Sequence, residues 1–207
     1  MKMLTDNTSR REALKRLAAI GALALLPTAA MLRPLSGQKT HFVGLGGAGF
    51  YLLSYFQSKL PNARYTWLDT ELPAQVPGFV DFIQTVSAGH LHDSVKSHLT
   101  GNDKIVLMAG LGGETGTPLM EQLSWWLHSN QMDFVAISNL PFTFQGRKIR
   151  ERALQTKSRL SALPNFRCLD LDDIGKPCGH LLLREVFEKA DEEFYAVYKE
   201  MTAVRRF

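Results

Sequence analysis

Residues 109–117 read Ala-Gly-Leu-Gly-Gly-Glu-Thr-Gly-Thr, between the apolar run Ile105–Met108 and a helical pattern that begins at Leu119. Glycines reach positive φ angles and let a ligand approach the backbone closely. The N-terminus of the following helix supplies N–H donors without intrahelical partners and a partial positive charge. Thr115 and Thr117 add hydroxyl groups. This turn between a buried strand and a helix is therefore predicted to bind phosphate.

A second glycine-rich turn, Gly44-Leu45-Gly46-Gly47-Ala48-Gly49, follows a predicted strand over residues 40–45. Its spacing fits the dinucleotide-binding fingerprint, and Asp69 lies near the end of the next predicted strand, where a ribose-binding acid belongs. Taken alone, this pattern favours an NAD- or FAD-binding oxidoreductase. An alternative is that these glycines bind no ligand and only let the strand and the helix pack closely. The sequence holds no glycine-lysine-serine/threonine phosphate loop.

The rest of the chain alternates between strand and helix patterns. Strands are expected over residues 40–45, 64–68, 104–109, 133–138 and 166–171, and helices after 49 as far as Pro61, over about 88–99, 118–129 and 147–160, and from about 181. Residues 72–85, rich in proline, are expected to be irregular. Such alternation predicts an α/β fold with a doubly wound, mostly parallel sheet. Both glycine turns would then lie at the carboxyl edge of the sheet, where ligands bind.

Charge and cysteine content exclude several classes of function. Residues 1–39 carry seven Lys/Arg and two acidic residues, a net of +5, so the remaining residues carry a net of −1. The globular part therefore lacks the clustered positive charge of a nucleic-acid-binding surface. Cys168 and Cys178 have neither the spacing of a metal site nor that of a disulfide framework. No catalytic residue or metal ligand is assigned, and the histidines form no metal-binding pattern.

Residues 1–37 are interpreted as a targeting or membrane-anchoring segment, and residues 38–207 as the globular domain. Ser9-Arg10-Arg11 opens a stretch similar to a bacterial twin-arginine export signal, and a small-residue cleavage site would fit Thr28-Ala29-Ala30. The apolar stretch from Leu17 to Leu32 is shorter than the roughly 20 residues of a membrane-spanning helix. An amphipathic or disordered tail is the alternative.

Four motifs in order resemble the tubulin/FtsZ superfamily. Residues 44–49 are similar to its first nucleotide loop, and Leu68-Asp69-Thr70-Glu71 to its valine-asparagine-threonine-aspartate motif. Residues 110–117 match its glycine-rich signature loop, and residues 135–148 its proline-phenylalanine loop followed by basic residues. The resemblance extends over about residues 40–205, and it implies the nucleotide-binding domain of that superfamily.

The resemblance implies GTP or GDP as the ligand, with Mg²⁺ as an accompanying ion, and it assigns roles to residues. The phosphate-binding residues would be Gly46, Gly47, Gly112, Gly113, Thr115, Gly116 and Thr117, within turns that also contain Gly44, Ala48, Gly49, Gly110 and Glu114. Asp69 and Gln145 would approach the ribose, and Phe187 and Asp191 (or Glu192) the base. Phe187 also continues an apolar stripe of the last helix, so an ordinary core role is the alternative.

The chain departs from the family pattern at several of these positions. Phe50 or Tyr51 stands where the family has an asparagine, and Glu114 replaces a glycine of the phosphate loop. A carboxylate beside phosphate is repulsive unless Mg²⁺ lies between them or the side chain turns outward. Gln145 replaces a ribose-binding glutamate and retains hydrogen-bonding capacity. The third loop of the family has no clear counterpart between Leu72 and Gly101, and at the sixth loop residues 169–174 lack the usual asparagine.

These features predict a guanine-nucleotide-binding, FtsZ-like protein: a weak GTPase or a regulator in filament-linked membrane remodelling or cell division. Its partner would be a full-length FtsZ-like protein or a second copy of itself, and its N-terminal segment would hold it at the cytoplasmic face of the membrane. Because the printed sequence ends at Phe207, after the family's central helix, we expect nucleotide binding to outlast self-activated hydrolysis. The alternatives are an interaction module that has lost its nucleotide, an NAD-dependent oxidoreductase, and export to the periplasm.

Overall fold

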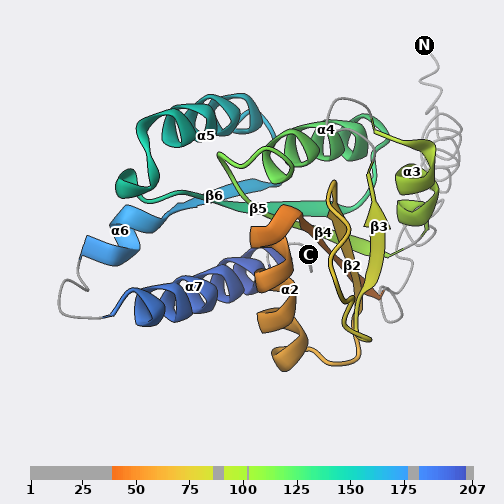
Figure 1. Cartoon of the computed structure of the whole chain (residues 1–207). Helices are drawn as coiled ribbons and strands as arrows, with labels where there is room; N and C mark the ends of the chain where they lie inside the picture. The colour runs from red at the N-terminus through yellow and green to blue at the C-terminus, as the bar shows by residue number, and fades with distance from the viewer. Residues whose placement is uncertain (1–38, 86–90, 102, 177–181, 204–207) are drawn as a thin grey trace, which may run out of the picture. The chain divides into compact units, whose positions relative to one another are not determined.

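The computed structural model describes residues 39–85, 91–101, 103–176 and 182–203 (Figure 1). The twin-arginine-like segment, its cleavage site and Cys178 lie outside these residues, and the proposed domain boundary stays a prediction. Within the described part of the chain, no helix combines the length and the apolar character needed to cross a membrane.

The core of the fold is a parallel sheet of six strands in the order β3-β2-β1-β4-β5-β6. Its strands are β1 (Thr40–Leu45), β2 (Arg64–Asp69), β3 (Asp81–Gln84), β4 (Lys104–Gly110), β5 (Phe134–Leu140) and β6 (Phe166–Asp170). The chain winds outward from β1 in one direction and from β4 in the other, so the strand order reverses between these two strands. The predicted α/β, doubly wound, parallel architecture is confirmed.

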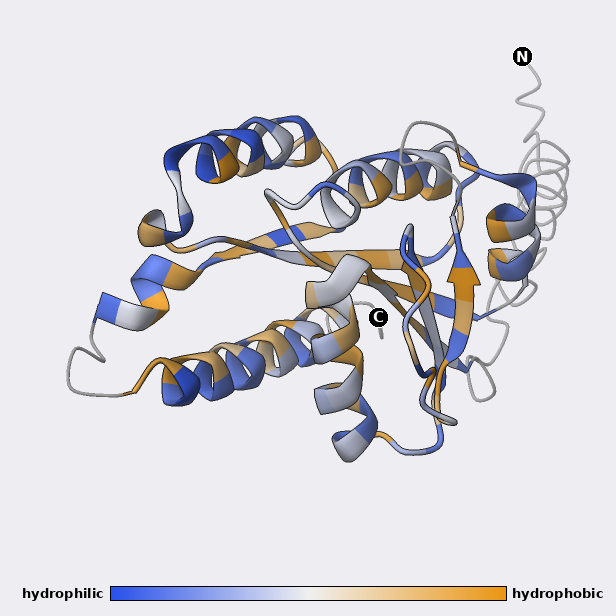
Figure 2. Ribbon diagram, viewed as in Figure 1, coloured by the Kyte–Doolittle hydropathy of each residue, from blue (hydrophilic) through white to orange (hydrophobic). Residues whose placement is uncertain are grey.

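Helices cover both faces of the sheet. Helices α2 (Gly46–Lys59) and α7 (Leu183–Ala203) lie on one face, and α3 (Asp93–Leu99), α4 (Gly116–Ser129) and α5 (Arg147–Leu160) on the other. Successive side chains of β4 point to opposite faces, so Leu107 joins the α4 side of the core and Met108 the α2 side. Figure 2 shows hydrophobic colour concentrated on the sheet and on the helix faces turned toward it.

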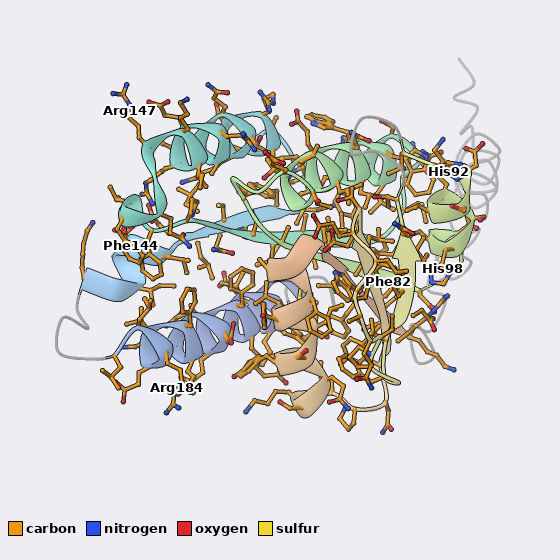
Figure 3. The ribbon with its side chains drawn as sticks, viewed as in Figure 1. Phe82, His92, His98, Phe144, Arg147 and Arg184 are labelled. Atoms are coloured by element: carbon orange, nitrogen blue, oxygen red, sulfur yellow. The ribbon has the colours of Figure 1, made fainter. Side chains whose placement is uncertain are left out.

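Several boundaries differ from the sequence prediction. The expectation of an irregular segment over residues 72–85 is wrong for β3, a four-residue edge strand that pairs with β2. Its only apolar members are Phe82 and Ile83, so no alternating pattern is long enough to reveal it. Phe82 is labelled in Figure 3. Its ring packs edge-on against that of Trp67. The five-residue helix α6 (Leu171–Gly175) was not predicted either. Helix α3 begins at Asp93, later than expected, and α4 begins at Gly116, two residues earlier.

A buried polar chain crosses the first two strands near their amino ends. His41 is 1% exposed, and its Nε2 atom lies 2.7 Å from Thr66 Oγ1. The same hydroxyl lies 2.9 Å from His98 Nε2 on α3, and Arg64 Nη2 lies 3.0 Å from that nitrogen. Burial, followed by the nearby Arg64 and His98, lowers the pKa of His41 to about 3. His41 is therefore a neutral member of the core.

Acid is expected to destabilise the protein through His41. Its pKa is lower in the folded chain than in the unfolded chain, so its contribution to stability is complete above pH 6.5 and declines toward pH 3. Between pH 7 and pH 5 we expect a loss of about 2 kcal/mol in the free energy of unfolding. Urea titrations of the parent and of His41→Gln would measure this loss, and the variant should show a shallower pH dependence.

The matched control for this prediction is His128→Gln, since His128 is an exposed histidine on α4. It should keep the pH dependence of the parent. Equal slopes for the parent and His41→Gln would contradict the assignment of this acid sensitivity to His41.

Candidate functional site

The two glycine turns meet at the carboxyl ends of β1 and β4, where the strand order reverses. The register pairs Leu45 with Ala109, so the two turns leave the sheet side by side. A Cβ atom added to Gly46 would lie 3.0 Å from the backbone nitrogen of Gly116, so the turns are in backbone contact. Gly46 has a φ of +68°, a conformation that favours glycine. This edge is the expected ligand site of an open parallel sheet.

The glycines of the turns divide into packed and open positions. A Cβ on Gly44 would lie 2.6 Å from the carbonyl oxygen of Gly49, and one on Gly49 would lie 2.6 Å from the carbonyl carbon of Gly44. These two glycines therefore allow α2 to cross closely over β1, as the packing alternative requires. In contrast, a Cβ on Gly47 or Gly113 would meet nothing within 4 Å, and both residues are exposed. The open glycines leave room for a ligand beside the backbone.

Hydrogen bonds hold the second turn in shape. The N–H of Gly112 donates to the buried hydroxyl of Thr117 at 2.7 Å, and Arg152 Nη1 donates to the carbonyl of Gly112 at 3.3 Å. The hydroxyl of Thr115 lies 2.8 Å from that of Thr70, which follows β2. Thr117 thus braces the turn from within. Because α4 begins at Gly116, the unpaired N–H groups of its first turn lie at the end of this loop.

The structure also places Glu114, which departs from the family pattern, and the small residues Gly110 and Ala48 of the two turns. Glu114 is exposed next to the open Gly113. A Cβ on Gly110 would lie 2.9 Å from the Cβ of Ala48, so these small residues also bring the two turns together.

The two residues predicted to approach a ribose make contacts within the chain. Asp69 is 8% exposed, and its Oδ1 atom accepts the N–H of Thr70 at 2.7 Å. This contact shapes the turn after β2. Gln145 is exposed, but its Oε1 atom accepts the N–H of Phe142 at 2.9 Å. The amide NH₂ and the second lone pair of Oε1 are left for a ribose contact. Both ribose roles stay predictions.

A pocket of about 360 Å³ lies beside the glycine turns, between α2 and α7. Residues from four segments line it: Ala48, Tyr51, Leu52, Asn139, Leu171, Phe187, Ala190, Asp191 and Phe194. Ala48 belongs to the first glycine turn, so the pocket is continuous with the place predicted for phosphates. Its size lies within the range typical of small-molecule sites.

Phe187 and Asp191 both line this pocket, one turn apart on α7. Phe187 is 40% exposed, whereas Val186, Ala190 and Phe194 supply the buried side of the helix. The apolar stripe of α7 is therefore not buried along its whole length, and Phe187, near the start of the helix, is not an ordinary core residue. Burial, with a smaller contribution from Glu188, raises the pKa of Asp191 to about 6.

Of the lining residues, sequence reasoning assigned a site role only to Ala48, Phe187 and Asp191, and Asn139 and Leu171 are among those that it missed. Asn139 lies near the carboxyl end of β5 and pairs in register with Gly110. Its position at the end of a strand beside a glycine turn was a readable signal. Leu171 comes from the unpredicted helix α6, so no comparable signal existed for it. The described residues contain no cluster of three or more His, Cys, Asp or Glu side chains suited to a metal ion.

Comparison with known proteins gives consistent results. No protein-family profile matches the chain. The cell division protein FtsZ 1 of Halobacterium salinarum is 31% identical over 123 residues, which are 56% of this chain and 28% of that protein. FtsZ of Aquifex aeolicus is 25% identical over 114 residues, which are 54% of this chain and 31% of that protein. The matched region thus spans less than a third of these curated relatives.

Solved structures extend the similarity to the whole fold. An empty FtsZ dimer of M. jannaschii superposes with a TM-score of 0.66 at 18% identity, covering 99% of this chain and 61% of the other. A GTPγS-bound protofilament of CetZ2 from Haloferax volcanii gives a TM-score of 0.60 at 19% identity, covering 80% and 59%. The curated FtsZ relatives and these structural neighbours point to the same fold. The chain therefore carries the GTPase-domain fold of the tubulin/FtsZ superfamily.

Proposed function

We propose that this protein binds a guanine nucleotide at the carboxyl edge of its sheet, with the phosphates over the two glycine turns and the base in the adjoining pocket. The observation that carries the proposal is the continuity of the two parts: Ala48 belongs to the first turn and also lines the pocket of Phe187 and Asp191. The open sides of Gly47 and Gly113 fit phosphate groups that approach the backbone. Among the neighbouring folds, CetZ2 was solved with GTPγS and the phage tubulin PhuZ with GDP.

Asp191 gives the pocket a preference for guanine over adenine. The Watson–Crick edge of guanine carries two N–H donors, at N1 and at the 2-amino group, which an ionised carboxylate accepts as a pair. Adenine presents an acceptor at its N1 and would place it against the same negative charge. Phe187, which lines the pocket and is partly exposed, offers a ring on which the base stacks. Asn139, at the end of β5, adds an amide that both donates and accepts.

The phosphate half needs positive charge because the second turn carries a carboxylate, Glu114. The N-terminus of α4 supplies partial positive charge, and Arg152 lies against the carbonyl of Gly112 at the rim of this turn. Mg²⁺ would neutralise phosphate charge further, and Glu114 is the carboxylate within the loop that fits it. The proposal concerns binding; turnover of the nucleotide is a separate property.

The wider role that we propose is in filament-linked remodelling of a membrane or in cell division, through association with a second copy or with a full-length FtsZ-like protein. Two neighbouring folds were solved as an FtsZ dimer and a PhuZ filament, which supports self-association.

We further propose that residues 1–37 attach the protein to the cytoplasmic face of the membrane. Protection of the domain from protease in intact spheroplasts, and its digestion in lysed ones, is the expected result; digestion in intact spheroplasts would indicate export.

The nucleotide proposal is tested by isothermal titration of the full chain with GTP, GDP, ATP and NAD. GTP and GDP are expected to bind, with ATP at least tenfold weaker because Asp191 opposes the adenine edge. No heat change with guanine nucleotides at millimolar concentration would contradict the proposal and favour an interaction module. Binding of NAD alone would favour the oxidoreductase.

A further inference from the structure

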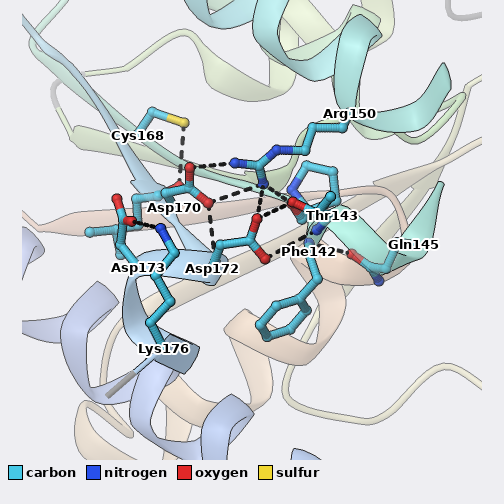
Figure 4. A network of polar contacts seen from close by, with 11 residues as sticks. Phe142, Thr143, Gln145, Arg150, Cys168, Asp170, Asp172, Asp173 and Lys176 are labelled. Carbon is cyan, nitrogen blue, oxygen red and sulfur yellow. Dashed lines mark hydrogen bonds and ion pairs between the residues drawn. The ribbon is translucent and has the colours of Figure 1, made fainter. Parts of the chain in front are cut away.

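Arg150 of α5 joins two loops that are far apart in the sequence (Figure 4). Its Nη2 atom lies 2.6 Å from Asp170 Oδ2 and its Nη1 atom 3.1 Å from Asp170 Oδ1, a bidentate pair with the end of β6. The same Nη1 donates to the carbonyl of Pro141, just after β5, and lies 3.1 Å from Asp172 Oδ2. One guanidinium therefore contacts two segments, called the two loops below: residues 141–146 after β5, and residues 170–175, which end β6 and form α6.

The two loops also bind each other directly around this guanidinium. The N–H of Thr143 donates to Asp172 Oδ1 at 3.1 Å, and its hydroxyl donates to the other oxygen of the same carboxylate. Asp170 caps the start of α6 by accepting the N–H of Asp172 at 3.1 Å. Arg150 and Asp170 are 19% and 20% exposed, so their pairing is shielded from much of the solvent. Partly buried bidentate pairs combine strength with a fixed geometry.

One loop lines the base pocket through Leu171, and the other packs against Phe187, which also lines it. Phe142, between Pro141 and Thr143, is buried, and its ring centroid lies 5.6 Å from that of Phe187 in an edge-on arrangement. Leu171, the residue after Asp170, lines the pocket itself. A Cβ on Gly175, at the end of α6, would lie 3.2 Å from the ring of Phe142. The positions of Phe187 and Leu171 therefore depend on how the two loops are held together.

We infer that Arg150 is a positioning residue for the base pocket: by locking the loops after β5 and β6 into one unit, it sets the placement of Phe187 and Leu171 around a guanine base. This inference rests on the proposed nucleotide function. Arg150 acts through Phe142 and Asp170 and not by touching the ligand. It holds the base half of the site, whereas Gly112, Thr117 and Arg152 hold the phosphate half.

Arg150→Met tests this division, with Arg159→Met as its matched control. Arg159 is on the same helix and makes a comparable bidentate pair, 2.6 Å and 2.8 Å to Glu121 on α4, but does not contact either loop. Titration with GDP probes the whole site, and titration with inorganic tripolyphosphate probes the phosphate half alone. Arg150→Met is expected to weaken GDP binding by about tenfold to a hundredfold and to leave tripolyphosphate binding unchanged. Arg150→Lys should recover only part of the loss, because an ammonium group cannot form the bidentate pair.

Amide hydrogen exchange of the ligand-free proteins tests the lock independently of nucleotide. In Arg150→Met, residues 141–146 and 171–175 should exchange faster together, whereas α4 and the Arg159→Met protein should match the parent. Unchanged exchange in both loops, or equal losses of GDP and tripolyphosphate binding, would overturn the inference. If the parent itself bound no GDP, the nucleotide proposal would fail, and the exchange measurement would still decide whether Arg150 couples the loops.

Discussion

Gly113→Val is expected to weaken GTP and GDP binding by about a hundredfold or more while leaving the melting temperature of the ligand-free protein nearly unchanged. A Cβ atom at this position would meet no atom of the protein within 4 Å, and the backbone is outside the positive-φ region. The folded chain therefore tolerates valine, and only a phosphate group over the turn would collide with it. Isothermal titration gives the affinity, and thermal denaturation with and without GTP gives the stability.

Gly78→Val is the matched control, because Gly78 is also exposed with nothing within 4 Å of a Cβ, but precedes the amino end of β3. It should retain the affinity and the nucleotide-induced rise in melting temperature of the parent. Gly116→Val would be less informative, since its Cβ would lie 2.8 Å from the carbonyl oxygen of Leu45 and would disturb the fold itself. Parent-like nucleotide binding by Gly113→Val would show that this turn is not the phosphate site.

Asp191→Asn is expected to abolish most of the preference for guanine, reducing the ratio of GTP to ATP affinity by about tenfold to a hundredfold. Asparagine keeps the size of the side chain but replaces one acceptor oxygen with an NH₂ group, which faces a guanine donor. Hydrogen bonds to a charged acceptor are stronger than those to a neutral one, so both the charge and the second acceptor count. Competition between labelled GDP and unlabelled GTP or ATP measures the ratio.

The pH dependence of binding provides a second readout for Asp191. Its pKa is raised to about 6 in the ligand-free pocket, so guanine affinity should fall as the pH decreases below 6 and the carboxyl group becomes protonated. The Asp191→Asn protein should lack this decline. Glu192→Gln is the control, because Glu192 is the adjacent acid on α7 but is exposed and does not line the pocket. Loss of guanine preference in Glu192→Gln alone would assign base recognition to Glu192.

The architecture could be predicted from sequence because its signals are long and repeated. Apolar strands alternate with helices, and each glycine turn follows a strand, so the parallel sheet and its ligand edge follow from the pattern. The short elements were missed: β3 has four residues and α6 has five, too few to display a period. The pairing of Arg150 with Asp170 was also unreadable, because it joins a helix to a strand end 20 positions away, with no pattern linking them.

The sequence motifs indicated which segments meet at this edge of the sheet more completely than they indicated the contacts made there. Both glycine turns, Phe187 and Asp191 lie around one edge of the sheet, as the motif order implies. However, the sequence does not reveal which polar groups bind within the chain. The hydroxyl of Thr117 accepts from Gly112, and the side-chain oxygen of Gln145 accepts from Phe142, because local geometry brings these atoms together. Such contacts depend on torsion angles that residue types alone do not specify.

The close backbone contact between Gly44 and Gly49 has a consequence for how proteins of this fold come to bind ligands of different size. Because Gly44 and Gly49 lack side chains, α2 packs at a short distance from β1. This distance determines where the residues of α2 stand in the wall of the pocket. A single methyl group at Gly44 or Gly49 would move α2 away from β1 and enlarge the pocket without changing any residue that faces the ligand. Changes in ligand size could therefore arise at positions that never meet the ligand.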